Sequence, residues 1–244
     1  MLTYEEHMPP AALLPFVRCV WTLRGEGDPA RTDRILPDGS FEVIFHRGEP
    51  FTRDGERQPR AMLVGEICRP TLVAASRDAN VLGIRFRLGG LGTLTGLHAR
   101  ELRDGIHDLR DVLGEDEPEG VLAMLSRRRG ERVDRRLSAA VSAIVTTDGR
   151  IRIRELAERA GTTERTLERL FDRLVGLRPK ELARLARFQA SLRGVDDGYY
   201  DDAHRVHEFQ QFAGAPPSVV FAERSEITDA FVGNLQDDAA AGDR

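Results

Sequence analysis

The feature that most constrains this chain is a stretch past its middle, residues 150–193, where two helical patterns meet at a glycine. The first pattern is a narrow apolar stripe at helical spacing, formed by Leu156, Ala157 and Ala160. Gly161 follows, and glycine enters a left-handed turn without the steric penalty of a Cβ atom. Thr162 or Thr163 then offers a hydroxyl group that caps a second helix. The pattern predicts two helices joined by a tight turn.

The second helix has a clear division between core and surface. Its core face repeats every three or four residues, through Leu167, Leu170, Phe171 and Leu174. Largely off that face lie Arg165, Thr166, Arg169 and Arg173. Gly176 and Pro179 end this helix, and residues 180–192 begin a third. Two short helices joined by a glycine-containing turn form a helix-turn-helix unit, whose second helix enters the major groove of DNA.

The charge of residues 150–193 distinguishes a DNA-binding helix-turn-helix from a simpler interpretation, in which any small helical hairpin gives the same spacing. Residues 150–193 carry twelve basic and six acidic side chains, a local net charge of +6, although the whole chain is at −4. Residues 1–149 sum to −2 and residues 194–244 to −8. A local basic patch is the electrostatic signature of phosphate binding, so the charge favours a DNA-binding unit.

At these residues the sequence resembles a known family. The run LAERAGTTERTLERLFDRLVGLRPKELARLARFQ resembles the first half of an AraC-type DNA-binding domain, and GYYDDAHRVHEFQQFAGAPPS resembles the end of the second half. The segments PPAALLPFVRCVWTLRG, RILPDGSFEVIFHRG and LGIRFRLGGLGTLTGLHARELRD are similar to the uncharacterised sensor-like N-terminal domain of one subgroup. The resemblance covers nearly the whole chain.

The resemblance implies a sequence-specific transcription regulator that binds double-stranded promoter or operator DNA. We expect Arg165, Thr166 and Arg169 to face base edges, with Arg173 and His204 on the same DNA-binding surface. Near the helix ends, phosphates are expected to contact Arg154, Arg178 and Lys180. The N-terminal domain is expected to sense a small-molecule effector or to mediate homodimerisation. No enzymatic activity, cofactor, metal or membrane association is expected.

The sequence predicts an α+β fold. Residues 1–115 form a β-rich, barrel-like or curled-sheet domain with flanking helices, and residues 116–149 form a helical connector. Within this domain, Arg34–Leu36 and Phe41–His46 flank a Pro37-Asp38-Gly39 turn and are expected to pair as a hairpin. Further strands are expected at residues 16–23, 61–67, 71–75 and 81–88, and a helical leucine pattern follows at residues 91, 94, 97 and 102. An all-α DNA-binding domain follows over residues 150–235, with the first helix-turn-helix at 150–193 and an incomplete second unit at 194–235. Residues 236–244 form an acidic tail.

The second unit is called incomplete because residues are missing between the third helix and Gly198-Tyr199-Tyr200. The family places the first helix of the second unit there, and about a dozen residues, close to one average helix, are absent. Either the gene product lost that helix or the residues were left out of the chain. Val206, Phe209 and Phe212 are then expected to form a partly exposed face, and Asp202 beside Asp201 disfavours phosphate. We therefore expect the first unit, and not the second, to bind DNA.

The sequence gives weaker signals for functions other than DNA binding. Two cysteines are too few for a disulfide framework, and neither a signal peptide nor a run of about 20 apolar residues is visible, so we expect a soluble cytoplasmic protein. A metal site could use His204 with His207, or His46 with Cys19 or Cys68. Two alternatives to the regulator thus stay open: a ligand- or protein-binding module whose helix-turn-helix is degenerate, and an enzyme with a metal in the N-terminal domain.

Overall fold

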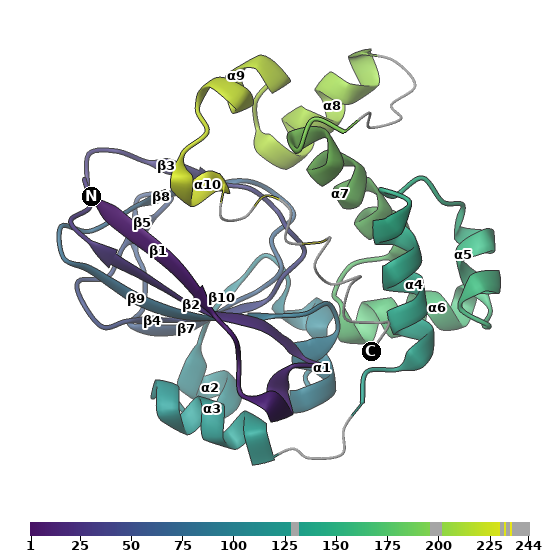
Figure 1. Cartoon of the computed structure of the whole chain (residues 1–244), viewed down its shortest axis with the longest axis horizontal. Coiled ribbons are helices and arrows are strands. Elements are labelled where there is room, and N and C mark those ends of the chain that lie inside the picture. The colour runs from purple at the N-terminus through teal and green to yellow at the C-terminus, as the bar shows by residue number, and fades with distance from the viewer. Residues whose placement is uncertain (128–131, 196–201, 230–231, 233–234, 236–244) are drawn as a thin grey trace.

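Two antiparallel sheets form the first part of the chain, and helices form the rest (Figure 1). The computed structural model describes residues 1–127, 132–195, 202–229, 232 and 235. The chain is therefore α+β, with its sheet region before its main group of helices, as the sequence predicts. None of the helices in these described ranges is both long enough and apolar enough to cross a lipid bilayer.

Among the described residues, the larger sheet has six strands and the smaller has four. The larger runs in the order β1 (Leu2–His7), β2 (Val17–Gly25), β9 (Ala79–Phe86), β4 (Glu42–His46), β7 (Ala61–Val64) and β10 (Ile106–Asp108). The smaller runs in the order β3 (Asp33–Ile35), β8 (Thr71–Ala74), β5 (Thr52–Arg53) and β6 (Glu56–Arg57). All the strand pairs are antiparallel.

Trp21 determines which residue can lie opposite it in the larger sheet. Trp21 on β2 lies opposite Gly83 on β9, and a Cβ atom at Gly83 would come within 2.1 Å of the indole ring. Glycine is thus required there, because a side chain on β9 would displace Trp21 from its buried place between the sheets. The sequence pattern for β2, β7, β8 and β9 is confirmed by the structure.

The hairpin predicted around Pro37-Asp38-Gly39 is wrong. β3 pairs with β8 in the smaller sheet, whereas β4 pairs with β7 and β9 in the larger one. The intervening loop, residues 36–41, carries the chain from one sheet to the other instead of reversing it, and we call it the crossing loop. Residues 36–39 of this loop are buried, because helices pack against its outer side.

Short helices flank the sheets, and longer ones follow. The first group comprises η1 (Ala11–Leu13), α1 (Gly90–Thr95), η2 (Ala99–Leu102), α2 (Leu109–Leu113) and α3 (Pro118–Arg127). The second comprises α4 (Arg135–Thr146), α5 (Ile153–Arg159), α6 (Glu164–Leu174), α7 (Pro179–Leu192), α8 (Asp202–Ala213), α9 (Pro217–Ala222) and α10 (Glu226–Asp229). The leucine pattern from 91 to 102 is split, because Gly96 ends α1 in a left-handed conformation with φ 76°.

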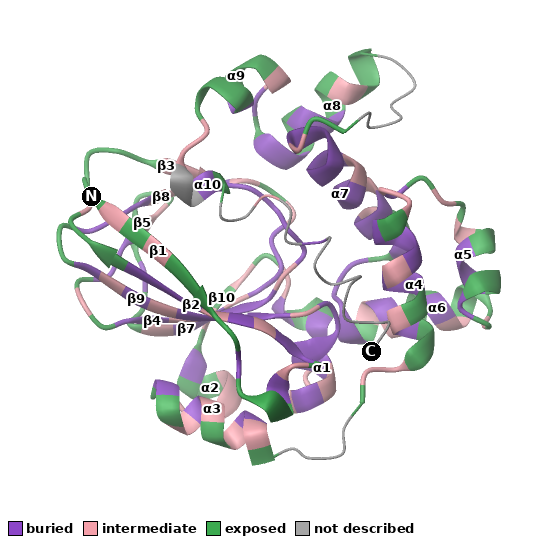
Figure 2. Cartoon of the chain, viewed as in Figure 1, coloured by how far each residue is buried: buried purple, intermediate pink, exposed green. Residues whose placement is uncertain are grey.

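The helical core and the sheets are joined by shared apolar residues. Leu36 and Leu88, from the sheet region, belong to the same buried cluster as the residues of α4, α5, α6 and α7. α7 is buried along most of its length (Figure 2). It lies between the sheet region and the other helices, so its position depends on both.

The incomplete second unit packs differently from the sequence-based expectation. Phe209 and Phe212 of α8 are buried, because both rings contact Phe188 of α7 at centroid distances of 5.1 and 5.2 Å. Val206 alone of the three predicted residues is exposed, at 40%. The predicted Asp201, the Gly198-Tyr199-Tyr200 turn and the tail 236–244 lie outside the described residues. α7 therefore supplies the packing that the absent helix does not.

We predict that Phe188→Ala destabilises the chain by about 3–5 kcal/mol, because it removes a buried ring that two others contact. Val206→Ala is the matched control on α8 and should change stability by less than about 1 kcal/mol. Urea unfolding measures both values. Similar losses for the two variants would show that the aromatic cluster does not hold α8.

Candidate nucleic-acid interface and ligand cavity

Helices α5 and α6 meet at the turn predicted from the sequence. Gly161 has φ 63°, in the left-handed region that favours glycine. Thr163 is the N-cap of α6, where its hydroxyl oxygen accepts a 3.3 Å hydrogen bond from the backbone N–H of Thr166. The inward residues Leu156, Ala157, Leu167 and Phe171 are buried in one cluster. Local sequence signals thus fix the angle between the two helices.

The exposed face of α6 carries a row of three arginines. Arg165, Arg169 and Arg173 are four residues apart, so they lie above one another on one side of the helix. All three are exposed, and no hydrogen bond or ion pair joins their side chains to any described residue. We call these three residues the arginine row. Its charges are available to a ligand, because no acidic side chain in the described ranges pairs with them.

The other sequence-predicted residues occupy several positions around α6. Thr166 is half-buried, and its hydroxyl oxygen accepts a hydrogen bond from Thr163 at 3.1 Å, so part of its role is capping. Arg154 on α5 is exposed and forms an ion pair with Glu158 at 3.1 Å. Arg178 and Lys180 are exposed at the start of α7.

His204 lies apart from these residues. It is in the first turn of α8, at 44% side-chain exposure and 3.9 Å from Glu208. α7, about 21 Å long at 1.5 Å per residue, separates α8 from α6 (Figure 1). The structure thus groups the residues of α5, α6 and the start of α7, and it does not bring His204 to them.

The sheet region holds the end of α6 and the start of α7. Asp172 of α6 pairs with Arg100 of η2 at 3.2 Å. Glu181, in the first turn of α7, accepts two hydrogen bonds from Arg103 at 3.2 and 3.3 Å. A motion of this sheet-region segment relative to the helices would therefore move α6.

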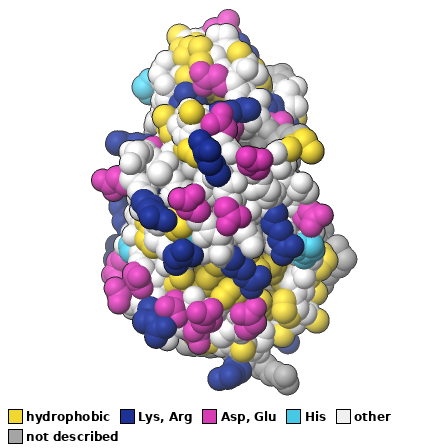
Figure 3. Space-filling model, turned by 90° about the vertical axis from the view of Figure 1, so that its left-hand side faces the viewer, with side chains coloured by type: hydrophobic (Ala, Val, Ile, Leu, Met, Phe, Trp, Pro, Cys, Tyr) yellow, Lys and Arg dark blue, Asp and Glu magenta, His cyan; other side chains and the backbone are white. Residues whose placement is uncertain are grey.

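The side of the molecule opposite α5 and α6 has acidic and basic side chains interspersed (Figure 3).

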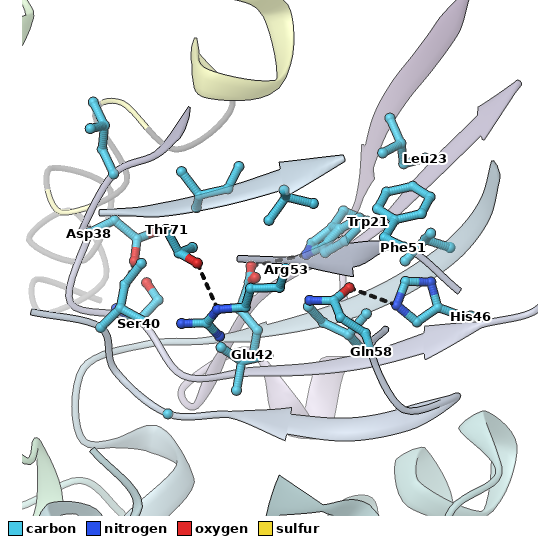
Figure 4. A pocket seen from close by; sticks show the side chains of 18 of the residues that line it. Trp21, Leu23, Asp38, Ser40, Glu42, His46, Phe51, Arg53, Gln58 and Thr71 are labelled. Atoms are coloured by element: carbon cyan, nitrogen blue, oxygen red, sulfur yellow. Dashed lines mark hydrogen bonds between the residues drawn. The ribbon is translucent and has the colours of Figure 1, made fainter. Parts of the chain in front are cut away.

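A cavity lies between the two sheets (Figure 4). Its volume is about 100 Å³, and its lining comes from both sheets and from the crossing loop. Most of the walls are apolar, including Trp21, Leu23, Phe51 and Val73. A few polar side chains also face it, an arrangement typical of small-molecule sites.

A buried ion pair forms part of the cavity wall. Glu42 accepts hydrogen bonds from Arg85 at 2.6 Å and from the Trp21 indole N–H at 3.1 Å. Arg85 also donates to Glu6 at 3.3 Å. Burial raises the pKa of Glu42, and the charge of Arg85 opposes that rise. The charge of Glu42 is therefore compensated inside the protein.

A buried histidine lies in another part of the same cavity. The Nε2 atom of His46 is 3.0 Å from the amide oxygen of Gln58, and its ring contacts Phe51. Burial lowers the pKa of His46 to about 4, because a cation is costly away from water. Cys19 is buried, and burial raises the pKa of its thiol to about 12. In the described ranges, no group of three or more His, Cys, Asp or Glu residues is placed to hold a metal ion.

The crossing loop connects the cavity to α7. Leu36, Asp38 and Ser40 line the cavity. On the loop's other side, the carbonyl oxygen of Pro37 accepts a buried 2.6 Å hydrogen bond from Gln189 of α7. Gly39 has φ 80°, and a Cβ atom added there would lie 3.4 Å from Leu185 of α7. One loop thus contacts both the cavity and the helix that follows α6.

Sequence reasoning missed every polar residue of this cavity except His46. Arg53 and Thr71 come from different strands of the smaller sheet, and Asp38 and Glu42 come from the loop and the larger sheet. Their proximity depends on strand pairing over long sequence separations. The only signal in the sequence was the Pro37-Asp38-Gly39 run, which was interpreted as a hairpin turn.

We predict that burial of His46 makes stability fall with acid. Between about pH 6.5 and the folded-state value near 4, the unfolded chain binds a proton that the folded chain excludes, so unfolding becomes easier as the pH falls. From about pH 7 to about pH 5, the wild type should lose about 2 kcal/mol more than His46→Gln, which has no proton to bind. Urea unfolding at both pH values measures the difference. Equal losses in the two proteins would contradict the prediction.

Comparisons with known proteins give one family and one structure. Residues 5–108 match a family described as a domain of unknown function, DUF6597, and this match spans both sheets and ends before α2. No curated protein matches the chain in sequence. Among solved structures, ToxT from Vibrio cholerae is similar to this chain, with a TM-score of 0.43 and 10% sequence identity. That similarity covers 92% of this chain and 99% of ToxT.

Proposed function

We propose that the chain is a sequence-specific DNA-binding transcription regulator, with α5 and α6 as its DNA-reading unit. The observation that carries this proposal is the arginine row. Three exposed arginines that have no acidic partner among the described residues, on the second helix of a glycine-turn pair, match what a helix needs to enter a major groove. Some other surface arginines, such as Arg159 with Glu155 at 2.7 Å, are compensated by neighbouring carboxylates.

In this proposal the residues divide between base edges and phosphates. Arg165 and Arg169 lie in the first half of α6, the part of a recognition helix that contacts bases, and Arg169 is assigned to guanine. Thr166 contacts a base with its remaining hydrogen-bonding capacity. Arg173, Arg154, Arg178 and Lys180 contact phosphates on either side. The ion pair of Arg154 with Glu158 is exposed, so it is weak and can exchange for a phosphate.

The same proposal includes control by a small-molecule effector in the cavity. An occupant would contact Leu36, Asp38 or Ser40, and those residues belong to the loop that Gln189 of α7 holds. A shift of this loop would change the position of α7 and, through it, that of α6. A ligand can act in this way only if it binds one loop position more tightly than another.

We propose one DNA-reading unit per chain. α8 is held to the sheet region by Arg34, which donates to the carbonyl oxygen of Ala213 at 3.0 Å and pairs with Glu223 at 3.0 Å. Arg34 satisfies a carbonyl at the end of α8, where a cation is favourable. We therefore assign α8 to bracing and not to base contacts, and His204 becomes at most a phosphate contact. A homodimer would then lengthen the DNA site.

The domain division in this proposal places a sensing domain at 1–115 and a connector at 116–149. The DNA-binding domain covers 150–235, and the tail 236–244 lies outside the described residues. The braced α8 favours a second candidate, a ligand- or protein-binding module that no longer reads DNA. That candidate predicts DNA affinity that is weak and insensitive to salt.

We predict that Arg169→Ala weakens binding to the cognate DNA site by about 1–3 kcal/mol while changing affinity for random duplex less, because a base contact is lost. Lys180→Ala should weaken both by similar factors, because phosphates are present in every sequence. Arg57→Ala, an exposed arginine on β6, is the control for net charge. Fluorescence anisotropy with both DNAs measures all three. Equal losses on both DNAs for Arg169→Ala would refute its role in base reading.

A further inference from the structure

The cavity between the sheets has one cationic side chain whose charge faces the interior. Arg53 lines the cavity, and its side chain is 14% exposed, so most of it is removed from water. Figure 4 shows its guanidinium extending among the lining side chains, with the Nε atom toward Thr71. Burial lowers the pKa of Arg53, which reflects the cost of holding a cation in this place.

A short relay fixes the orientation of Arg53. Its Nε atom donates to the hydroxyl oxygen of Thr71 at 2.8 Å, and Thr71 in turn donates to Asp54 at 2.5 Å. Asp54 also accepts from the backbone N–H of Leu72 at 2.9 Å. These bonds use only the Nε edge of the guanidinium. In the described part of the chain, its two terminal nitrogens have no hydrogen-bond partner.

The two carboxylates that line the cavity are compensated by other groups. Glu42 is bound by Arg85 and by the Trp21 indole. Asp38 accepts a hydrogen bond from the backbone N–H of Ser40 at 2.9 Å, and its charge acts on Arg85. Arg53 is therefore the charged group of the cavity that lacks a full set of partners, and a planar guanidinium edge with two free N–H directions matches a carboxylate.

Size and wall chemistry limit the rest of the occupant. A volume of about 100 Å³ is two thirds of the engineered cavity of about 150 Å³ that holds benzene, so a short branched chain fills it and a benzene ring exceeds it. Trp21, Phe51 and the ring of His46 supply flat apolar walls. A long acyl chain or a second fused ring exceeds this space.

We propose that the cavity binds a small monocarboxylate with a compact apolar body, and that the terminal nitrogens of Arg53 hold the carboxylate. The apolar body lies against Trp21 and Phe51. This inference deepens the proposed function, because it names the chemical class of the effector. Asp54 lies 3.8 Å from the Nε atom of Arg53, so the carboxylate of the ligand takes the two terminal nitrogens that Asp54 does not reach. The body reaches the crossing loop through Leu36 and Ser40.

Three probes of the same shape and of different charge test the chemical class of the ligand. Isobutyrate is an anion, isobutyramide is neutral and isobutyramidinium is a cation, and each is titrated into the full chain by calorimetry. Emission from Trp21, the only tryptophan of the chain, reports whether binding occurs in the cavity. We expect isobutyrate to bind about 10- to 100-fold more tightly than isobutyramide, with isobutyramidinium weakest. 2-Naphthoate and decanoate should bind more weakly than isobutyrate, because they are too large.

Variants of Arg53 and of a control arginine then test whether Arg53 holds the carboxylate. Arg53→Gln should weaken isobutyrate binding about 10- to 100-fold, and Arg57→Gln on the neighbouring strand β6 should leave it unchanged. Thermal unfolding of each variant establishes that it is folded. If Arg53→Gln does not fold, the comparison of the three probes on the wild-type chain still tests the proposal, because it needs no variant.

The proposal is overturned if isobutyrate produces no heat and no change in Trp21 emission. It is also overturned if the three probes bind equally, if isobutyramidinium binds tightest, or if Arg53→Gln retains wild-type affinity. DNA binding is measured separately on the same preparation. Isobutyrate binding without sequence-specific DNA binding would contradict the proposed regulator function and support the ligand class. Sequence-specific DNA binding without isobutyrate binding would support the regulator function and overturn the ligand class.

Discussion

The rest of the structure depends on the buried contact between the crossing loop and α7. Gln189 is a polar side chain in the last turn of α7, fully removed from water, and its amide donates to the Pro37 carbonyl at 2.6 Å. Loss of that bond would take from the Pro37 carbonyl its hydrogen bond to Gln189, at a cost of about 1–3 kcal/mol. The bond therefore fixes where α7 meets the sheets, and α7 fixes where the other helices lie.

The helices contact the sheet region at both ends of the helical part, and the contacts at the two ends differ in kind. At one end, Arg103 of the sheet region forms an ion pair with Glu181 of α7, and Arg100 forms one with Asp172 of α6. Both ion pairs are partly exposed, so solvent screens them. At the other end, Arg34 binds the last turn of α8, and three phenylalanine rings pack between α7 and α8. The arginine row lies near the first, more polar end. The proposed reading helix is thus held by the apolar packing of Leu167 and Phe171 and also by ion pairs that can rearrange, whereas three phenylalanine rings hold α8.

The sequence predicted those parts of the fold that depend on neighbours along the chain. The α5–α6 pair, its glycine turn and its Thr163 cap follow from spacings of a few residues, and the structure has them where they were predicted. β1 was missed because LTYEEH is a polar edge strand, which lacks the apolar alternation of a half-buried one. The partner of β3 was wrong because pairing over long separations leaves no local mark. Arg53 was missed for the same reason: its importance comes from Thr71 and from a cavity that only the folded chain has.

The central claim is that one helix of this chain reads DNA, and affinity measured against salt tests it most directly. The purified full chain is titrated with the DNA that lies upstream of its own gene and with random duplex, over a series of salt concentrations. The account predicts tight binding that weakens steeply as salt rises, because arginines replace counterions at phosphates, together with a clear preference for the upstream DNA. Weak binding that ignores salt and prefers neither DNA would contradict it.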